Sequence, residues 1–253
     1  MNNFLYLLPS MFTAGNMFSG FFSIITSLKN NFETASWAVI VAIIFDGLDG
    51  IISRLCKEQD LFGVEFDSLA DLVSFCIAPM VLLYRIVLYN YGSSGILIAF
   101  IYILFGSIRL ARYNVVAIKE KGSNIFFEGL PTPAAAGAMV SIVLLLNSIE
   151  QNFFGRKNVI IVILPVILKF LPIIILVVSV LMITKLRYIS FSKLKINRRV
   201  TFKMFTLIVG VLLLIFAYPE STIFLVFGIY IITGFVDYLI RIYKIRATKY
   251  FLK

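Results

Sequence analysis

The sequence predicts an all-α integral membrane protein, a polytopic bundle of about eight transmembrane helices. Of its 253 residues 60% are hydrophobic and only 14% are charged, whereas soluble domains are roughly 45–50% apolar and about 25% charged. The mean hydropathy is +0.99, and apolar runs of membrane length recur from one end to the other. Since no segment is polar enough for a soluble domain, residues 1–253 are expected to form a single transmembrane domain.

Polar breaks separate apolar runs of about 20 residues, the length that crosses a bilayer as a helix. The runs cover 4–28, 34–53, 67–89, 95–114, 131–149, 159–184, 201–218 and 221–241. The polar motifs fall in a core of about 4–184, and the last two runs are additional C-terminal helices at about 201–241. In the fifth run, the small residues Ala134, Ala135, Gly137 and Ala138 predict close packing against a neighbouring helix.

Basic residues are unevenly divided between the two sides of this arrangement. An even number of spans places both termini on one side, which also receives eighteen lysines and arginines, against Lys29, Arg156 and Lys157 on the other. Basic loops favour the cytoplasmic side, so both termini are predicted to be cytoplasmic. This topology also accounts for the net charge of +10, and we therefore expect no nucleic-acid partner.

The chain contains no histidine and only two cysteines, Cys56 and Cys76. Imidazole metal sites and nucleophilic triads that need histidine are thereby excluded, and no disulfide framework is possible. Any catalytic chemistry is expected to depend on carboxylates.

Four aspartates, Asp46, Asp49, Asp67 and Asp71, fall within 26 residues at the ends of two predicted helices. The first two are three residues apart and the last two are four apart, so each pair shares one helix face. An antiparallel hairpin brings both pairs together, and buried like charges repel unless a cation neutralises them. Oxygen ligands without histidine or cysteine favour Mg²⁺ or Mn²⁺, and four aspartates suit two ions. Such a site is typical of phosphoryl transfer.

The aspartates lie in two motifs, DGLDGIISR at 46–54 and GVEFDSLAD at 63–71. These motifs resemble the signature of the CDP-alcohol phosphatidyltransferases, DxxDGxxAR followed by GxxxDxxxD after eight residues. Every charged and glycine position matches, and the one departure is Ser53 in place of the usual alanine. The resemblance implies the fold of this family, two divalent ions and a homodimer.

Roles for individual residues follow from that resemblance. Asp46, Asp49 and Asp67 would hold the metals, while Asp71 would complete the second ion and accept the proton of the attacking hydroxyl. The nucleotide would lie against Gly50, Ser53, Arg54 and Gly63, with Thr13 and Asn16 of the first helix approaching the cytidine. Hydrogen bonding between helices is an equally good explanation for Thr13 and Asn16.

Two further segments, GSIRLARYNV at 106–115 and GLPTPAAAG at 129–137, are similar to the serine-accepting branch of the family. That similarity implies transfer of the phosphatidyl group from CDP-diacylglycerol to L-serine, with release of CMP. Arg109 and Arg112 share a helix face and could bind the serine carboxylate, although topology alone also predicts basic residues there. Asn114, Lys121 and Glu128 are weaker candidates.

Two alternatives remain open at this point. Another enzyme of the same family would use glycerol 3-phosphate, inositol phosphate or choline as acceptor, and a phosphorylated acceptor would need more converging cations. A Mg²⁺ channel or transporter would distribute its carboxylates across the depth of the bilayer, whereas all four aspartates are predicted at one end. An active site facing the cytoplasm would let lipid tails stay in the membrane while a soluble acceptor enters from water.

Overall fold

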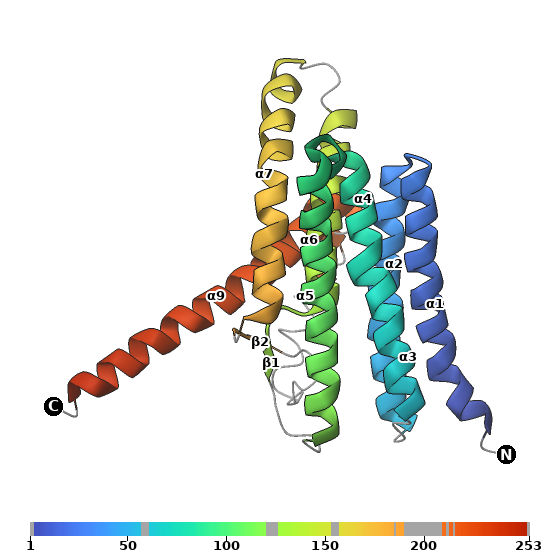
Figure 1. Cartoon of the computed structure of the whole chain (residues 1–253), viewed down its shortest axis with the longest axis vertical. Helices are drawn as coiled ribbons and strands as arrows, with labels where there is room; N and C mark the ends of the chain where they lie inside the picture. Colours follow the sequence, from blue (N-terminus) through green and yellow to red (C-terminus); the bar gives the residue numbers. More distant parts are fainter. Residues whose placement is uncertain are drawn as a thin grey trace.

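The computed structural model describes residues 3–56, 61–119, 126–152, 157–184, 186–189, 209–210, 213–214 and 216–251. Long helices dominate this part of the chain, as the hydropathy predicts, and most of them run side by side as a bundle (Figure 1). Among the described residues, six helical segments are long and apolar enough to cross a membrane. The chain is therefore a multi-pass membrane protein.

The first half of the bundle consists of α1 and α2, followed by a third rod that changes its helical form along its length. Its elements are α1 (Asn3–Leu28), α2 (Phe32–Cys56), α3 (Leu61–Asp71), the π-helix η1 (Leu72–Ile77), α4 (Ala78–Ile86) and the 3₁₀ turn η2 (Leu88–Tyr91). Asn30, at φ 61°, makes the tight turn between α1 and α2, and asparagine tolerates this left-handed conformation better than most residues. The two helices consequently pack as an antiparallel pair.

The second half of the bundle contains three long helices, a short ribbon and one oblique helix. Its elements are α5 (Gly92–Lys119), β1 (Phe126–Glu128), α6 (Thr132–Asn152), α7 (Lys157–Ile183), β2 (Arg187–Ile189) and α9 (Pro219–Phe251). The strands pair antiparallel with Phe127 opposite Tyr188, and α9 crosses the other helices obliquely (Figure 1). The ribbon thus joins the segment before α6 to the segment after α7.

The predicted helices agree with this arrangement wherever the structure describes the chain. The first six predicted runs coincide with α1, α2, the α3–α4 rod, α5, α6 and α7, and the eighth lies within α9. Most of the seventh run, 201–218, lies outside the described residues, so the count of eight stays a prediction. The short ribbon was not predicted, because three residues per strand leave no readable period.

Small residues on α6 allow α9 to approach closely, as the alanine-rich stretch predicted. Ala135 and Ala136 are fully buried, and a Cβ at Gly137 would lie 2.2 Å from the ring of Phe227 on α9. Because a membrane supplies little hydrophobic drive between helices, such close van der Waals contact is a main source of their association.

The π-helix η1 follows Asp71 directly and sits against both α1 and α5. Its wider turn alters the backbone hydrogen bonding, and the Tyr102 hydroxyl of α5 donates to the Phe75 carbonyl at 3.3 Å. On α1, Gly20 leaves room for Ser74, whose hydroxyl donates to the Asn16 carbonyl at 2.9 Å. Single π turns inside α-helices often occur at functional sites, and this one joins an aspartate helix to α1.

The contact at Gly20 gives a test of this packing. A Cβ added there would lie 2.3 Å from Ser74 Oγ and 2.6 Å from its Cα, so the backbone would have to shift. We expect Gly20→Ala to destabilise the protein by about 1–3 kcal/mol, a typical cost of overpacking, measured as a lower Tm in detergent.

The matched control for Gly20→Ala is Gly228→Ala on α9, where no atom of the described neighbours lies within 4 Å of the added Cβ. That variant should keep the wild-type Tm or raise it, because alanine favours helix over glycine. Equal Tm values for the two variants would contradict the close contact between α1 and η1.

Candidate active site

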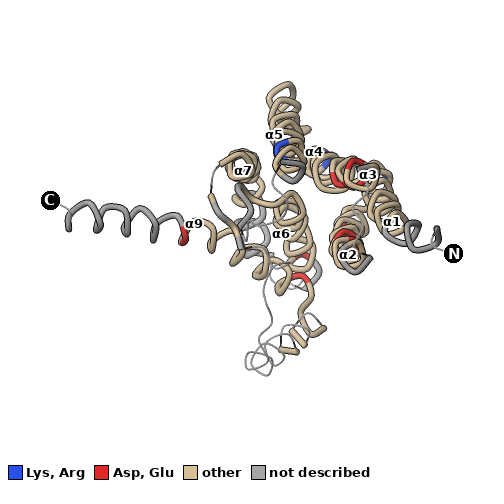
Figure 2. The backbone as a smooth tube through the Cα atoms, turned by 90° about the horizontal axis from the view of Figure 1, so that it is seen from below, with Lys and Arg blue, Asp and Glu red and all other residues tan. Residues whose placement is uncertain are grey.

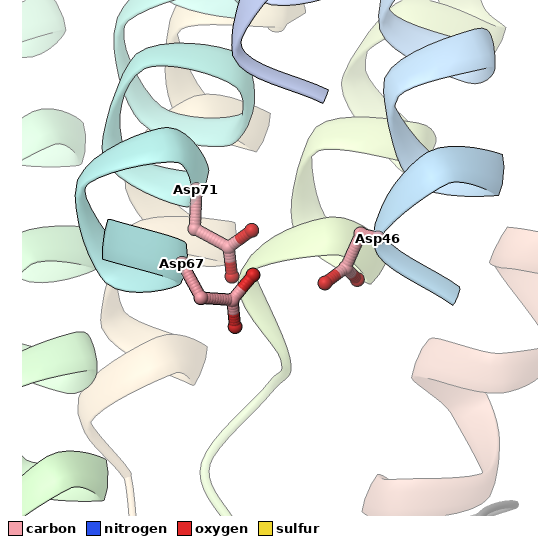
Figure 3. Close-up of side chains that lie close together, drawn as sticks. All are labelled: Asp46, Asp67 and Asp71. Carbon is pink, nitrogen blue, oxygen red and sulfur yellow. The ribbon is translucent and has the colours of Figure 1, made fainter. Parts of the chain in front are cut away.

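Three aspartates from two helices converge at one end of the bundle. One carboxylate oxygen from each of Asp46, Asp67 and Asp71 lies within 4.8 Å of the other two. Asp67 and Asp71 project from successive turns of α3 toward Asp46 on α2 (Figure 3), and acidic positions are seen on both helices when the molecule is viewed from below (Figure 2). The predicted hairpin therefore brings carboxylates from both motifs together.

The donor set of this group suits a divalent metal ion. All its ligand atoms are carboxylate oxygens, which hard cations such as Mg²⁺, Mn²⁺ and Ca²⁺ prefer. Asp71 is only 8% exposed, and Asp67 Oδ1 is buried without a hydrogen-bond partner among the described residues. Because like charges so close together repel strongly in a poorly solvated site, a bound cation would relieve the repulsion and satisfy the unpartnered oxygen.

Asp49 lies outside this group of three. It is buried one turn after Asp46 on α2 and accepts a hydrogen bond from the hydroxyl of Thr13 on α1. Its predicted role as a metal ligand therefore stays a prediction, while its partner on α1 is defined.

Asn16 connects α1 with the other aspartate helix. The side chain is fully buried, and its Nδ2 donates to Asp71 Oδ1 at 3.1 Å. Its own Oδ1 has no hydrogen-bond partner among the described residues. Thr13 and Asn16, two polar residues of an apolar helix, thus each donate a hydrogen bond to one aspartate. This is the hydrogen bonding between helices that the sequence analysis considered for them.

Arg109 of α5 places a positive charge near the three aspartates. It is 8% exposed, and its positive charge is close enough to interact with Asp71 and Asp46. Its Nη1 donates to the hydroxyl of Thr132 at 3.0 Å, whereas its Nε is buried without a partner in the described part of the chain. A buried guanidinium with an unused donor beside three carboxylates is suited to bind an anionic group.

This geometry is accompanied by sequence similarity to known proteins. The sequence model of CDP-alcohol phosphatidyltransferases matches residues 6–170, which include every aspartate of the site. The chain belongs to the CDP-alcohol phosphatidyltransferase family. Enzymes of this family use divalent metals, in agreement with the donor set of Asp46, Asp67 and Asp71.

Three relatives show which members of the family this chain resembles. The chain is 37% identical to a CDP-diacylglycerol–serine O-phosphatidyltransferase of Helicobacter pylori, over 98% of this chain and 97% of the relative. It is 31% identical to an archaetidylserine synthase of Methanothermobacter thermautotrophicus, over 72% of this chain and 69% of the relative. A CDP-diacylglycerol–serine O-phosphatidyltransferase of Bacillus subtilis is 33% identical over 56% of this chain.

The remaining positions of the family signature lie on the same two helices. Gly50 and Ser53 are on the last turns of α2, and Gly63 is on the first turn of α3. Among the described residues, no atom beyond the local helix lies within 4 Å of a Cβ built on Gly47 or Gly63, so the described neighbours leave space for a ligand beside both glycines. The Arg54 side chain, predicted to contact the nucleotide, lies outside the described side chains.

The second predicted serine-binding arginine has a different partner. Arg112 is one turn beyond Arg109 on α5, and its Nη1 donates to the carbonyl of Ile183 at 3.2 Å. A cation at the last carbonyls of a helix satisfies its free acceptors and its dipole, so Arg112 stabilises the end of α7. Asn114 exchanges hydrogen bonds with Ser68 on α3.

Three residues near the aspartates were not predicted as site residues. Thr132, at the first turn of α6, accepts a hydrogen bond from Arg109. Ser74 of the π-helix donates to the backbone carbonyl of Asn16. Tyr230 of α9 interacts electrostatically with Arg109. Thr132 is part of the GLPTPAAAG segment, so its polarity between two prolines was a usable signal. Tyr230 offered none, because tyrosine is common in membrane helices.

The metal site can be tested by binding alone. We expect the purified protein to bind Mn²⁺, and Asp46→Asn and Asp67→Asn each to weaken binding at least about tenfold, because each removes a charged ligand. Electron paramagnetic resonance of free Mn²⁺ would measure the affinity. Glu33→Gln, whose carboxylate accepts from Asn147 away from the site, serves as the control, and an equal loss in that variant would contradict a site at the aspartates.

Proposed function

We propose that this protein transfers the phosphatidyl group from CDP-diacylglycerol to the hydroxyl of L-serine and releases CMP. The proposal rests chiefly on the near full-length identity of 37% to the Helicobacter pylori serine transferase. The site is compatible with the reaction, since three clustered aspartates that suit a divalent metal ion lie near the buried Arg109. The lipid donor, with its tails in the bilayer, would meet soluble serine at the end of the helices.

The cofactor of this reaction would be Mg²⁺ or Mn²⁺, bound as two ions. Asp46, Asp67 and Asp71 would hold one ion, and Asp49, one turn from Asp46, would contribute to the second. Metal ions in such a site bind phosphate oxygens and stabilise the charge of the leaving group. Thr13 would then fix the orientation of Asp49 through its hydrogen bond.

Asp71 is proposed as the general base. The serine hydroxyl oxygen forms the new bond to phosphorus, its proton passes to the Asp71 carboxylate, and the bond from phosphorus to CMP breaks. A serine hydroxyl is a weak nucleophile at neutral pH, so a carboxylate within hydrogen-bond reach assists the attack. Asn16 donates to Oδ1 of Asp71, and this bond would fix the orientation of the carboxylate that accepts the proton.

The nucleotide is proposed to lie over the ends of α2 and α3. Gly50, Ser53 and Gly63 are close to the aspartates in sequence, and their small size permits close approach of a ligand. Arg54 would pair with phosphate, as an arginine suits. The unpartnered Oδ1 of Asn16 is an acceptor that the cytidine amino group could use.

Arg109 is proposed to bind the serine carboxylate. Its charge interacts with Asp71, so a bound acceptor could place its carboxylate at the guanidinium and its hydroxyl at the base. Arg112 is only a secondary candidate for binding the serine carboxylate, because its Nη1 already donates to the carbonyl of Ile183.

The proposed orientation of the protein in the membrane follows from the distribution of basic residues along the sequence. With eighteen basic residues on the side of the aspartates, the positive-inside rule favours a cytoplasmic active site and cytoplasmic termini. We further propose membrane lipid around the helices and a homodimer, the state that the family resemblance implies.

A different acceptor within the family is the second candidate function. The archaetidylserine synthase similarity also points to serine but with another lipid donor. Among the described residues, Arg109 is the buried cation that interacts with the aspartates, which suits a carboxylate better than a phosphorylated acceptor that needs several cations. A Mg²⁺ channel would require carboxylates distributed across the membrane, whereas Asp46, Asp67 and Asp71 have carboxylate oxygens within 4.8 Å of one another.

The reaction is tested by measuring CMP release in detergent with CDP-diacylglycerol and Mg²⁺. We expect release with L-serine but not with glycerol 3-phosphate or inositol phosphate, and loss of activity on chelation. Asp71→Asn should lower kcat at least about 100-fold, since general bases contribute roughly 10²–10⁴ in rate, while Glu33→Gln keeps the wild-type rate. Release with another acceptor would replace serine in the proposal, and release with none would contradict the transferase function.

The two arginines provide a matched pair of variants. Arg109→Gln should raise the serine KM roughly 10–100-fold, because hydrogen bonds to charged groups contribute about 1.5–3 kcal/mol, while the KM for CDP-diacylglycerol changes little. Arg112→Gln should mainly lower the Tm through the loss of its bond to Ile183. An unchanged serine KM in Arg109→Gln would reject its role.

A further inference from the structure

The side chain of Tyr188 has no function in the site described so far. It lies on β2, directly after α7, and is 1% exposed. Its hydroxyl is buried without a hydrogen-bond partner among the described residues. A buried phenol usually finds a partner, so this hydroxyl is a donor that a bound ligand could use.

The fold holds the Tyr188 ring in a defined place. On one side is α9, where a Cβ at Gly234 would lie 2.2 Å from Cε1 of the ring. The neighbouring turn of α9 supplies Tyr230, whose ring centroid is 5.5 Å from that of Tyr188. The ribbon is fixed in turn because the Gly129 amide donates to the Leu186 carbonyl at 2.8 Å. Tyr188 is therefore positioned by α9 and by the segment of Gly129.

Tyr230 links this ring to the aspartate site. It interacts electrostatically with both Tyr188 and Arg109. Arg109 in turn interacts with Asp71 and has a buried Nε without a partner in the described part of the chain. The residues Asp71, Arg109, Tyr230 and Tyr188 thus interact in succession, and among the described residues two of them, Arg109 and Tyr188, have a buried donor without a partner.

We propose that Tyr188 and Tyr230 form the wall of the acceptor pocket opposite the aspartates, and that the Tyr188 hydroxyl donates a hydrogen bond to the carboxylate of the acceptor. This inference rests on the proposed function and adds a specificity residue from the segments that follow α7. A guanidinium and a phenol are both donors at neutral pH, and two such donors select an anionic group over an ammonium.

The protonation state of Tyr188 agrees with a donor role. Burial raises the pKa of Tyr188 to about 12, so the phenol stays protonated throughout the neutral range. Its hydrogen bond would therefore add no pH dependence of its own to serine binding between pH 6 and about 9.

The test is Tyr188→Phe, which removes the hydroxyl and keeps the ring against Gly234. We expect the serine KM to rise about tenfold, the ratio that one hydrogen bond to a charged group supports, with kcat and the KM for CDP-diacylglycerol nearly unchanged. Without serine, the variant should be at least as thermally stable as the wild type, because it no longer buries an unpartnered hydroxyl. Tyr84→Phe, in the ring pair with Tyr89 on α4 and η2, is the control.

A second variant tests position instead of chemistry. Gly234→Ala would displace the Tyr188 ring and should also raise the serine KM, whereas Gly228→Ala on the same helix should not. An unchanged serine KM in Tyr188→Phe would overturn the inference and leave the serine transferase intact. No serine-dependent CMP release by the wild type would instead overturn the proposed function, and the inference with it.

Discussion

The mutual repulsion of Asp46, Asp67 and Asp71 is the constraint on which the rest of the site depends. Three carboxylates within 4.8 Å of one another, one of them only 8% exposed, are unfavourable in a membrane bundle unless a positive charge compensates them. Arg109 supplies part of that compensation from α5, and the all-oxygen donor set suits a divalent ion for the remainder. The α2–α3 hairpin, α5 and the first turn of α6 are all organised around this requirement.

Polar residues on α1 orient two of the aspartates through hydrogen bonds. Thr13 and Asn16 are three residues apart on one helix face, and each donates to one aspartate, Asp49 or Asp71. The π-helix η1 brings Ser74 to the Asn16 carbonyl in the space left by Gly20. Because hydrogen bonds and close contact between helices replace the hydrophobic effect inside a membrane, the same contacts stabilise the bundle and orient Asp49 and Asp71.

The C-terminal segments extend the same argument to the acceptor. The ribbon and α9 surround the Tyr188 ring and bring Tyr230 beside Arg109. Under the proposed roles, α2 and α3, which carry the aspartates, would serve the phosphate chemistry, whereas α5, β2 and α9 would contact the amino acid. Substrate selection and metal binding would then reside on different elements, so that one can vary while the other is maintained.

Much of the fold and the metal site could be predicted from the sequence, because both depend on local spacing. Hydropathy determined the helices, and the i, i+3 and i, i+4 spacing of the aspartates determined that each pair shares a face. The tertiary structure alone decided which residues contact one another. Thr13 and Asn16 donate hydrogen bonds to aspartates. Arg109 interacts with Asp71 and with Tyr230 of α9, whereas Arg112, one turn further along α5, binds the end of α7. Sequence spacing places residues on a helix face, but the rotation and crossing of each helix, set by contacts such as Gly20 with Ser74 and Gly137 with Phe227, decide what that face touches.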